Sequence, residues 1–158
     1  MEIYEENYPK RKSVHKVLMH SYIAYFAFFF LGMILDLFLN IKLEFLNNAI
    51  SGIVGFVFLL FATSLIIWAQ KTTRKLNKES ISKETFCKGP YRFSRNPTHI
   101  GLLFLLVGFG LVYNTPFVLL LSIIYFIVAK MSFLKEEEKI LTEKYGDPYV
   151  EYKNSVRI

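Results

Sequence analysis

Two polar segments border the apolar runs of this chain of 158 residues, and their residue types are suited to binding a charged ligand. The first, residues 89–101, reads GPYRFSRNPTHIG. Its two prolines exclude a continuous helix, so we expect a shaped loop in which Pro97 opens a helix and Asn96 is the N-cap. The unpaired N–H groups of that helix start, together with Arg92 and Arg95, predict a site for a carboxylate or phosphate. Binding of lipid headgroups by the two arginines is an equally good explanation.

The second segment is the run Glu136, Glu137 and Glu138, which follows the last apolar segment. Such a run is often only a solvated helix face. Successive helix positions differ by about 100°, however, so the three carboxylates cannot all point the same way. One of them must face the neighbouring helices, at the same membrane depth as the two arginines. A small molecule with one cationic and one anionic group would fit between the two segments.

The elements that position these segments are apolar. Hydrophobic residues make up 53% of the chain and aromatic residues 17%, which is typical of a membrane protein. Residues 17–39 and 49–70 are each long enough to cross a hydrocarbon core of about 30 Å. A turn signature at residues 113–116 divides the next apolar run into helices 98–113 and 116–132. The predicted fold class is therefore all-α, a polytopic membrane protein with four transmembrane helices.

The placement of basic residues favours four spans. Of the 19 lysines and arginines, only Lys42 lies on the far side in a four-span arrangement. Basic residues of short loops stay in the cytoplasm, so both termini and the polar segments are predicted to be cytoplasmic. The net charge of +6 is explained by anionic lipid headgroups and requires no nucleic acid partner. One cysteine and three scattered histidines predict no metal site.

Residues outside the two polar segments have structural interpretations. Small residues of the second span permit close helix packing; they are Ser51, Gly52, Gly55, Ala62 and Ser64. Asp36 is expected to be an acid at the membrane interface. After residue 132, apolar positions recur at helical spacing, which predicts a cytoplasmic amphipathic helix that stops near Gly146. Asp147 and Pro148 then open a short helix or turn.

Together, the two segments resemble the integral-membrane methyltransferases that include isoprenylcysteine carboxyl methyltransferase and the phospholipid N-methyltransferases. Their pattern has an early block Gly-x-Tyr-x-x-x-Arg-(His/Asn)-Pro, a helical hairpin, and a late block with paired glutamates and tyrosines. The matching residues of the early block are Gly89, Tyr91, Arg95, Asn96, Pro97 and Gly101. Those of the late block are Glu137, Glu138, Leu141, Tyr145, Gly146, Tyr149 and Tyr152.

The resemblance implies a single membrane-embedded methyltransferase domain over residues 1–158, with its catalytic region at 83–158. It implies S-adenosylmethionine as the cofactor, which carries an ammonium and a carboxylate. The implied acceptor is a lipid-like or small hydrophobic molecule that enters from the bilayer. With the charge argument above, cofactor binding is assigned to Tyr91, Arg92, Asn96, Pro97, Thr98, His99, Gly101 and Glu137. Catalysis is assigned to Arg95, Glu138 and His99.

The chain departs from the family pattern at three positions. His99 stands where the family has a tyrosine, and Lys83 where many members have a histidine. Phe133 replaces an arginine that helps isoprenylcysteine methyltransferases to bind their substrate, which weakens the case for a prenylcysteine carboxylate. Two other function classes stay open, a membrane reductase of the sterol-reductase type with a nicotinamide cofactor and a non-catalytic lipid-binding membrane protein. The sequence leaves monomer and dimer equally open.

Overall fold

The computed structural model describes residues 14–42, 48–74 and 81–156. Within these ranges the chain is helical and contains no strand. The helices, in chain order, are α1 (Val14–Leu39), α2 (Asn48–Arg74), α3 (Lys83–Phe86), the 3-10 helix η1 (Gly89–Arg92), α4 (Pro97–Tyr113), α5 (Pro116–Met131), α6 (Phe133–Tyr145) and α7 (Asp147–Ser155). The predicted all-α class is confirmed.

The four predicted spans coincide with the four long helices α1, α2, α4 and α5 to within a few residues. Three stretches are long and apolar enough to cross a membrane, namely Lys16–Leu39, Asn48–Arg74 and Pro116–Tyr145, which comprises α5 and α6. The fourth helix, α4, is equally apolar but has only 17 residues. The described part of the chain therefore has three to four helices of membrane-spanning character.

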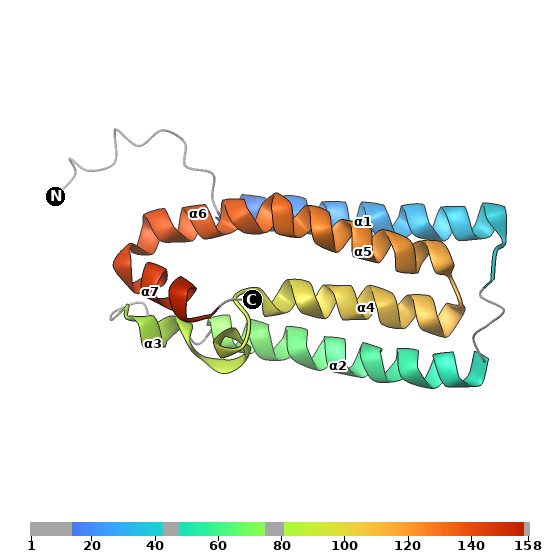
Figure 1. Ribbon diagram of the computed structural model, residues 1–158, viewed down its shortest axis with the longest axis horizontal. Helices are drawn as coiled ribbons and strands as arrows, with labels where there is room; N and C mark the ends of the chain where they lie inside the picture. The colour runs from blue at the N-terminus through green and yellow to red at the C-terminus, as the bar shows by residue number, and fades with distance from the viewer. Residues whose placement is uncertain (1–13, 43–47, 75–80, 157–158) are drawn as a thin grey trace.

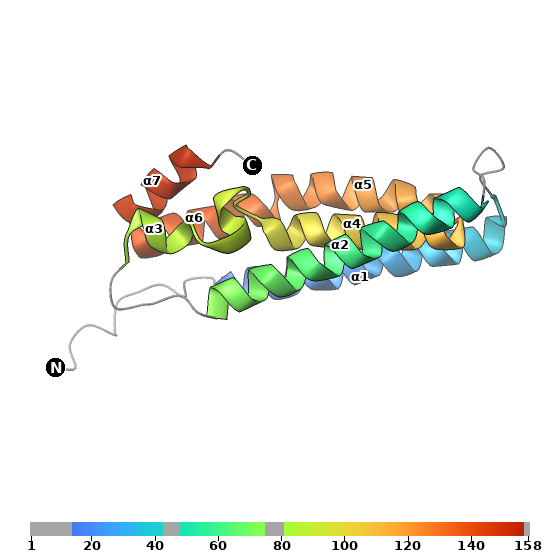
Figure 2. The ribbon, with the colours of Figure 1, turned by 90° about the horizontal axis from the view of Figure 1, so that it is seen from below.

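The long helices form two packed pairs. α2 packs along α4, α1 packs along α5, and contacts between α4 and α5 join the pairs (Figures 1 and 2). The short elements α3, η1, α6 and α7 lie together beyond one end of this bundle (Figure 1). Both predicted polar segments are therefore at the same end of the molecule.

The α2–α4 pair packs closely because each helix presents a glycine to the other. A Cβ on Gly55 would lie 2.7 Å from the carbonyl oxygen of Gly108, and a Cβ on Gly108 would lie 2.8 Å from that of Gly55. The prediction of small packing residues is confirmed for Ser51, Gly55 and Ala62, which are buried. It is wrong for Gly52, which has open space beside it, and for the exposed Ser64.

Asp36 holds the turn between α4 and α5 instead of facing the membrane interface. Its carboxylate is 5% exposed and accepts hydrogen bonds from the backbone N–H groups of Phe117 and Val118, each at 3.1 Å. These are two of the unpaired donors in the first turn of α5, and a carboxylate there is also favoured by the helix dipole. The expectation of an interfacial acid is therefore wrong, because the acid belongs to a buried helix cap.

The predicted ends of the other elements are confirmed. Asn114 adopts a left-handed conformation with φ of 50° directly after α4, as the turn signature requires. Gly146, with φ of 61°, ends α6, and Asp147 and Pro148 open α7. Ser132 separates α5 from α6, so the last span does continue into a further helix, with a one-residue break.

Candidate functional site

The loop before α4 has a defined shape. Gly89 has φ of 56°, and a Cβ at this position would collide with the hydroxyl of Thr72. The N–H of Ser94 donates to the carbonyl of Pro90 at 3.2 Å, and the N–H of Asn96 donates to the Ser94 hydroxyl at 3.1 Å. Asn96 occupies the predicted N-cap position, although its side chain makes no capping hydrogen bond. The loop thus holds Arg95 one residue before the helix cap.

Arg95 lies directly against the acidic run, whereas the charge argument placed the two at the same membrane depth with a ligand between them. The Arg95 Nη1 lies 2.9 Å from Glu138 Oε1, and Lys153 Nζ lies 2.9 Å from Glu138 Oε2. Glu138 is therefore the member of the acidic run that faces the loop, and it binds one cation with each oxygen. The Nε of Arg95 is buried and has no hydrogen-bond partner within the described part of the chain. An uncompensated buried donor of this kind is costly, so it marks a place where a ligand acceptor would be stabilised.

Glu137 makes no ion pair with any residue that the structure describes, although it is half-buried. It is close enough for an electrostatic interaction with the hydroxyl groups of Tyr22 in α1 and Tyr149 in α7. Burial raises the pKa of Tyr149, and the charges of Glu138 and Glu137 raise it further, whereas Arg95 acts in the opposite direction. Among the described residues of the site, Glu137 is therefore a carboxylate with no cation bound to it.

Aromatic side chains from three elements enclose this cluster. The ring of Phe86 in α3 lies 5.2 Å from Tyr145, 5.4 Å from Tyr149 and 5.7 Å from Tyr152, measured between centroids. The Tyr152 hydroxyl donates to the backbone carbonyl of Tyr91 at 2.8 Å. Hydrogen bonding between the Tyr91 and Thr73 hydroxyls, at 2.9 Å, extends this connection to α2. α7 is thus attached to the loop that carries Arg95.

His99 takes part in a different polar cluster, inside the bundle. Its Nε2 lies 3.0 Å from the Ser21 hydroxyl of α1, which also lies 2.9 Å from the Tyr125 hydroxyl of α5. The Tyr125 hydroxyl lies 2.9 Å from the Ser21 carbonyl, to which it donates. His99 is buried, and none of its hydrogen bonds within the described residues reaches Arg95 or Glu138. Its contacts join three helices.

Four other predicted site residues have varied surroundings. Arg92 is exposed, and its guanidinium lies 5.4 Å from the centroid of the Phe93 ring. Pro97 is fully buried at the start of α4, and Thr98 beside it is half-buried. A Cβ on Gly101 would lie 2.5 Å from Ile66, so close packing of α4 on α2 explains this glycine. The structure therefore brings Arg95, Glu137 and Glu138 together with Tyr91 nearby.

The sequence argument did not single out Lys153. This residue lies four positions after Tyr149, so both side chains are on one face of α7, toward Glu138. The four-residue spacing from Tyr149 is the feature of the sequence that could have indicated Lys153 as a site residue. Tyr149 and Tyr152 were noted only as part of the late block, yet both line the cluster.

Apolar helices of membrane-spanning length, with a compact charged and aromatic cluster beyond one end, are typical of an integral membrane protein with a binding site next to the bilayer. The sequence model of the phospholipid methyltransferase family matches residues 47–148, more than half of the chain. The chain therefore belongs to this family, and the predicted resemblance is confirmed. No curated protein and no solved structure matches it.

The matched region begins beside α2 and ends in the first turn of α7. It contains the loop with Arg95 and the acidic run, but neither α1 nor Lys153. The family is one of methyltransferases, so the match does not favour the reductase interpretation.

Proposed function

We propose that the protein is an S-adenosylmethionine-dependent membrane methyltransferase that modifies a lipid-like or small hydrophobic acceptor. Family membership supports methyl transfer. The observation that carries the cofactor assignment is the pairing of an uncompensated donor, Arg95 Nε, with a carboxylate that lacks a cation, Glu137. Opposite unsatisfied groups of this kind suit a zwitterion.

The residues present fit the methionine part of the cofactor, which carries a carboxylate and an ammonium. Arg95 would bind the carboxylate, and Glu137 would bind the ammonium. Glu138 would act as a positioning residue, since both of its oxygens already hold Arg95 and Lys153. Tyr91 and the aromatic residues around Phe86 would enclose the remainder of the cofactor.

The cofactor supplies an electrophilic methyl group on a sulfonium. The contribution of the chain is then to hold the reactants in line and to exclude water. Arg95 and Glu138 fix each other, and α7 is attached to the loop by the Tyr152 hydroxyl. The catalytic assignment of His99 remains a proposal of its own, in which the buried histidine positions the start of α4 through its contact with Ser21.

Acceptor chemistry is inferred from the surroundings of the site. The charged cluster lies directly beyond apolar helices, so an acceptor that partitions into the bilayer would reach it laterally. Phe133, at the position where related enzymes carry a substrate-binding arginine, is half-buried against the hydrophobic core. An acceptor without a carboxylate at that point is therefore favoured.

In this proposal the whole chain forms one domain with its catalytic region at residues 83–158. Both termini and the charged cluster lie on the cytoplasmic face. Of the basic residues that support this orientation, the described ones on α6 and α7 lie at the same end of the molecule as Arg95. Labelling of single cysteines in intact cells tests it: a cysteine at position 139 should resist an impermeant reagent, and one at position 42 should react.

Calorimetry on the detergent-purified protein tests the cofactor site. The parent should bind S-adenosylmethionine and S-adenosylhomocysteine saturably, while Glu137→Gln and Arg95→Met should each lose at least about tenfold in affinity, or 1.4 kcal/mol. Glu143→Gln, an exposed carboxylate on the same helix, is the matched control and should bind like the parent. A folded parent that binds neither compound would contradict the proposal.

A further inference from the structure

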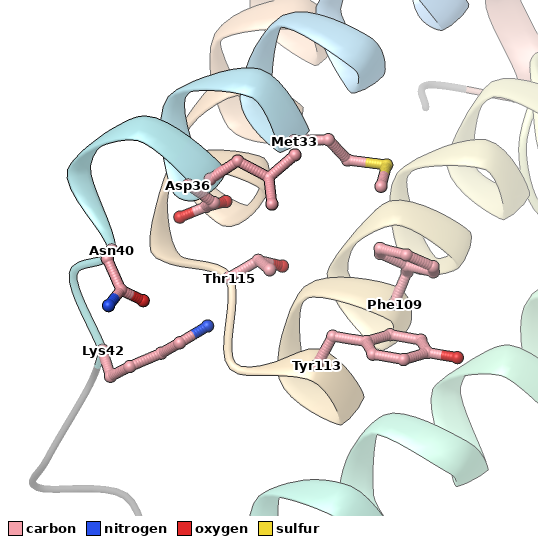
Figure 3. Close-up of a pocket in the computed structure, with 8 residues that line it drawn as sticks. Met33, Asp36, Asn40, Lys42, Phe109, Tyr113 and Thr115 are labelled. Carbon is pink, nitrogen blue, oxygen red and sulfur yellow. The ribbon is translucent and has the colours of Figure 1, made fainter.

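A cavity lies at the end of the bundle opposite the charged cluster, where α1 ends and α4 turns into α5 (Figure 3). Its volume is about 470 Å³. Residues from α1, from α4 and from the segments after these helices line it: Met33, Asp36, Leu37, Asn40, Lys42, Phe109, Tyr113 and Thr115. None of them belongs to the charged cluster around Glu138, so the cavity is separate from the candidate cofactor site.

The hydroxyl of Thr115 is the most informative group in this cavity. Thr115 is the N-cap residue of α5, a position at which threonine normally accepts a hydrogen bond from the second or third N–H of the helix. Asp36 occupies both of those donors, at Phe117 and Val118. The Thr115 oxygen is consequently buried, with no hydrogen-bond partner among the residues that the structure describes. Figure 3 shows this side chain between α1 and α4, directed into the cavity.

Lys42 provides the ammonium of the cavity. Among the residues that the structure describes, it makes a long hydrogen bond of 3.4 Å to the carbonyl of Asn114 and no ion pair. Asp36 also lines the cavity, and both of its carboxylate oxygens accept hydrogen bonds from backbone N–H groups of α5, so its negative charge is held at the start of that helix. The polar end of the cavity thus offers one ammonium and one hydroxyl, a pair of donors suited to an anionic oxygen.

The remaining wall is apolar and partly exposed. Met33 of α1 lies across the cavity from Phe109 and Tyr113 of α4 (Figure 3), and Leu37 of α1 also lines this wall. Leu37 is 77% exposed and Tyr113 is 61% exposed, so a hydrocarbon chain would cover surface that the protein itself leaves uncovered. A polar end that offers an ammonium and a hydroxyl donor, together with an apolar wall, suits an anionic amphiphile.

We propose that this cavity binds an anionic lipid of the leaflet opposite the candidate active site. The phosphate headgroup contacts Lys42 and the Thr115 hydroxyl, and one acyl chain lies along Leu37, Phe109 and Tyr113. This binding site does not depend on the proposed methyl transfer. It would strengthen the contact between α1 and the α4–α5 turn, which Asp36 already bridges.

A local fluorescent reporter tests the proposal. Trp68, the single tryptophan, is changed to phenylalanine, and Tyr113→Trp places the reporter in the cavity wall. The protein is reconstituted in nanodiscs in which phosphatidylglycerol or phosphatidylcholine carries the same brominated acyl chains. We expect phosphatidylglycerol to reach half-maximal quenching at about a five- to tenfold lower mole fraction than phosphatidylcholine.

Three variants of the reporter protein test which residues cause the preference, measured as the half-maximal mole fraction of phosphatidylcholine divided by that of phosphatidylglycerol. Lys42→Gln should reduce this ratio to about one. Thr115→Val should reduce it by at least about half, whereas Thr115→Ser should retain it. Lys130→Gln, an exposed lysine at the other end of α5, is the matched control and should leave the ratio unchanged. Equal quenching by the two lipids in the reporter protein, or a full preference in Lys42→Gln, would overturn the proposal and leave only unspecific bilayer contact.

Discussion

Glu138 binds two cations of unequal burial, and this inequality predicts how the stability of the cluster depends on each partner. The Arg95 side chain is 18% exposed and that of Glu138 is 13% exposed, whereas Lys153 is 41% exposed. Water therefore screens the contact with Lys153 far more than the contact with Arg95. Deleting the acid should cost much more free energy than deleting the lysine.

The magnitudes follow from burial. Glu138→Met removes the partner of a nearly buried arginine, a change that typically costs 3–5 kcal/mol, and the residual exposure favours the lower end, about 3 kcal/mol. Lys153→Met removes a partly exposed partner and leaves Glu138 paired with Arg95. An exposed pair contributes only about 0.2–1 kcal/mol, so about 0.5 kcal/mol is expected.

The assay is reversible unfolding in mixed micelles of increasing dodecyl sulfate content, followed by circular dichroism. Lys139→Met, an exposed lysine on α6, is the matched control for the loss of a positive charge. The double variant Glu138→Met with Lys153→Met should be no less stable than Glu138→Met alone, because the lysine has already lost its partner. Equal costs for the two single variants, or a loss below about 1 kcal/mol for Glu138→Met, would refute the assignment of burial and partners.

Three further predictions concern the elements around the sites. Gly108→Ala should destabilise the protein by about 1–3 kcal/mol, because its Cβ would meet the Gly55 carbonyl, whereas Gly52→Ala in open space should be close to neutral in the same unfolding assay. Asp36→Ala should cost about 2 kcal/mol through loss of the α5 cap, and an unchanged unfolding midpoint would contradict that role. Tyr152→Phe should cost about 1 kcal/mol and lower cofactor affinity in calorimetry, because α7 loses its hydrogen bond to the loop; equal affinity would separate α7 from the site.

The positions of the long helices could be predicted from the sequence because they depend on local properties. Runs of apolar residues fixed the spans, and the turn at Asn114 and the stop at Gly146 were evident from residues that tolerate a positive φ. The shared membrane depth of Arg95 and the acidic run was also predictable, since one segment precedes an apolar run and the other follows one on the same side. These inferences require no knowledge of how the helices pack.

Contacts between residues distant in sequence were not predictable. Asp36 caps a helix 81 positions further along the chain, and nothing near Asp36 indicates that partner. The three adjacent glutamates look alike in the sequence, and only the rotation of α6 against the loop selects Glu138 for Arg95. Lys153 reaches Glu138 because the chain reverses at Gly146, where the backbone has φ of 61°. Gly101 and His99 follow the motif, but their neighbours depend on helix packing.

The central claim is that this chain transfers a methyl group from S-adenosylmethionine to a molecule in the bilayer. The most direct measurement incubates the purified protein, in vesicles made from the lipids of its source membranes, with cofactor labelled in its methyl group. Label should pass into the organic-soluble fraction with the parent and the Glu143→Gln control, and the rate should fall at least about tenfold with Glu137→Gln. Label that stays in the aqueous phase, with a folded parent that binds the cofactor, would contradict the claim of a membrane acceptor.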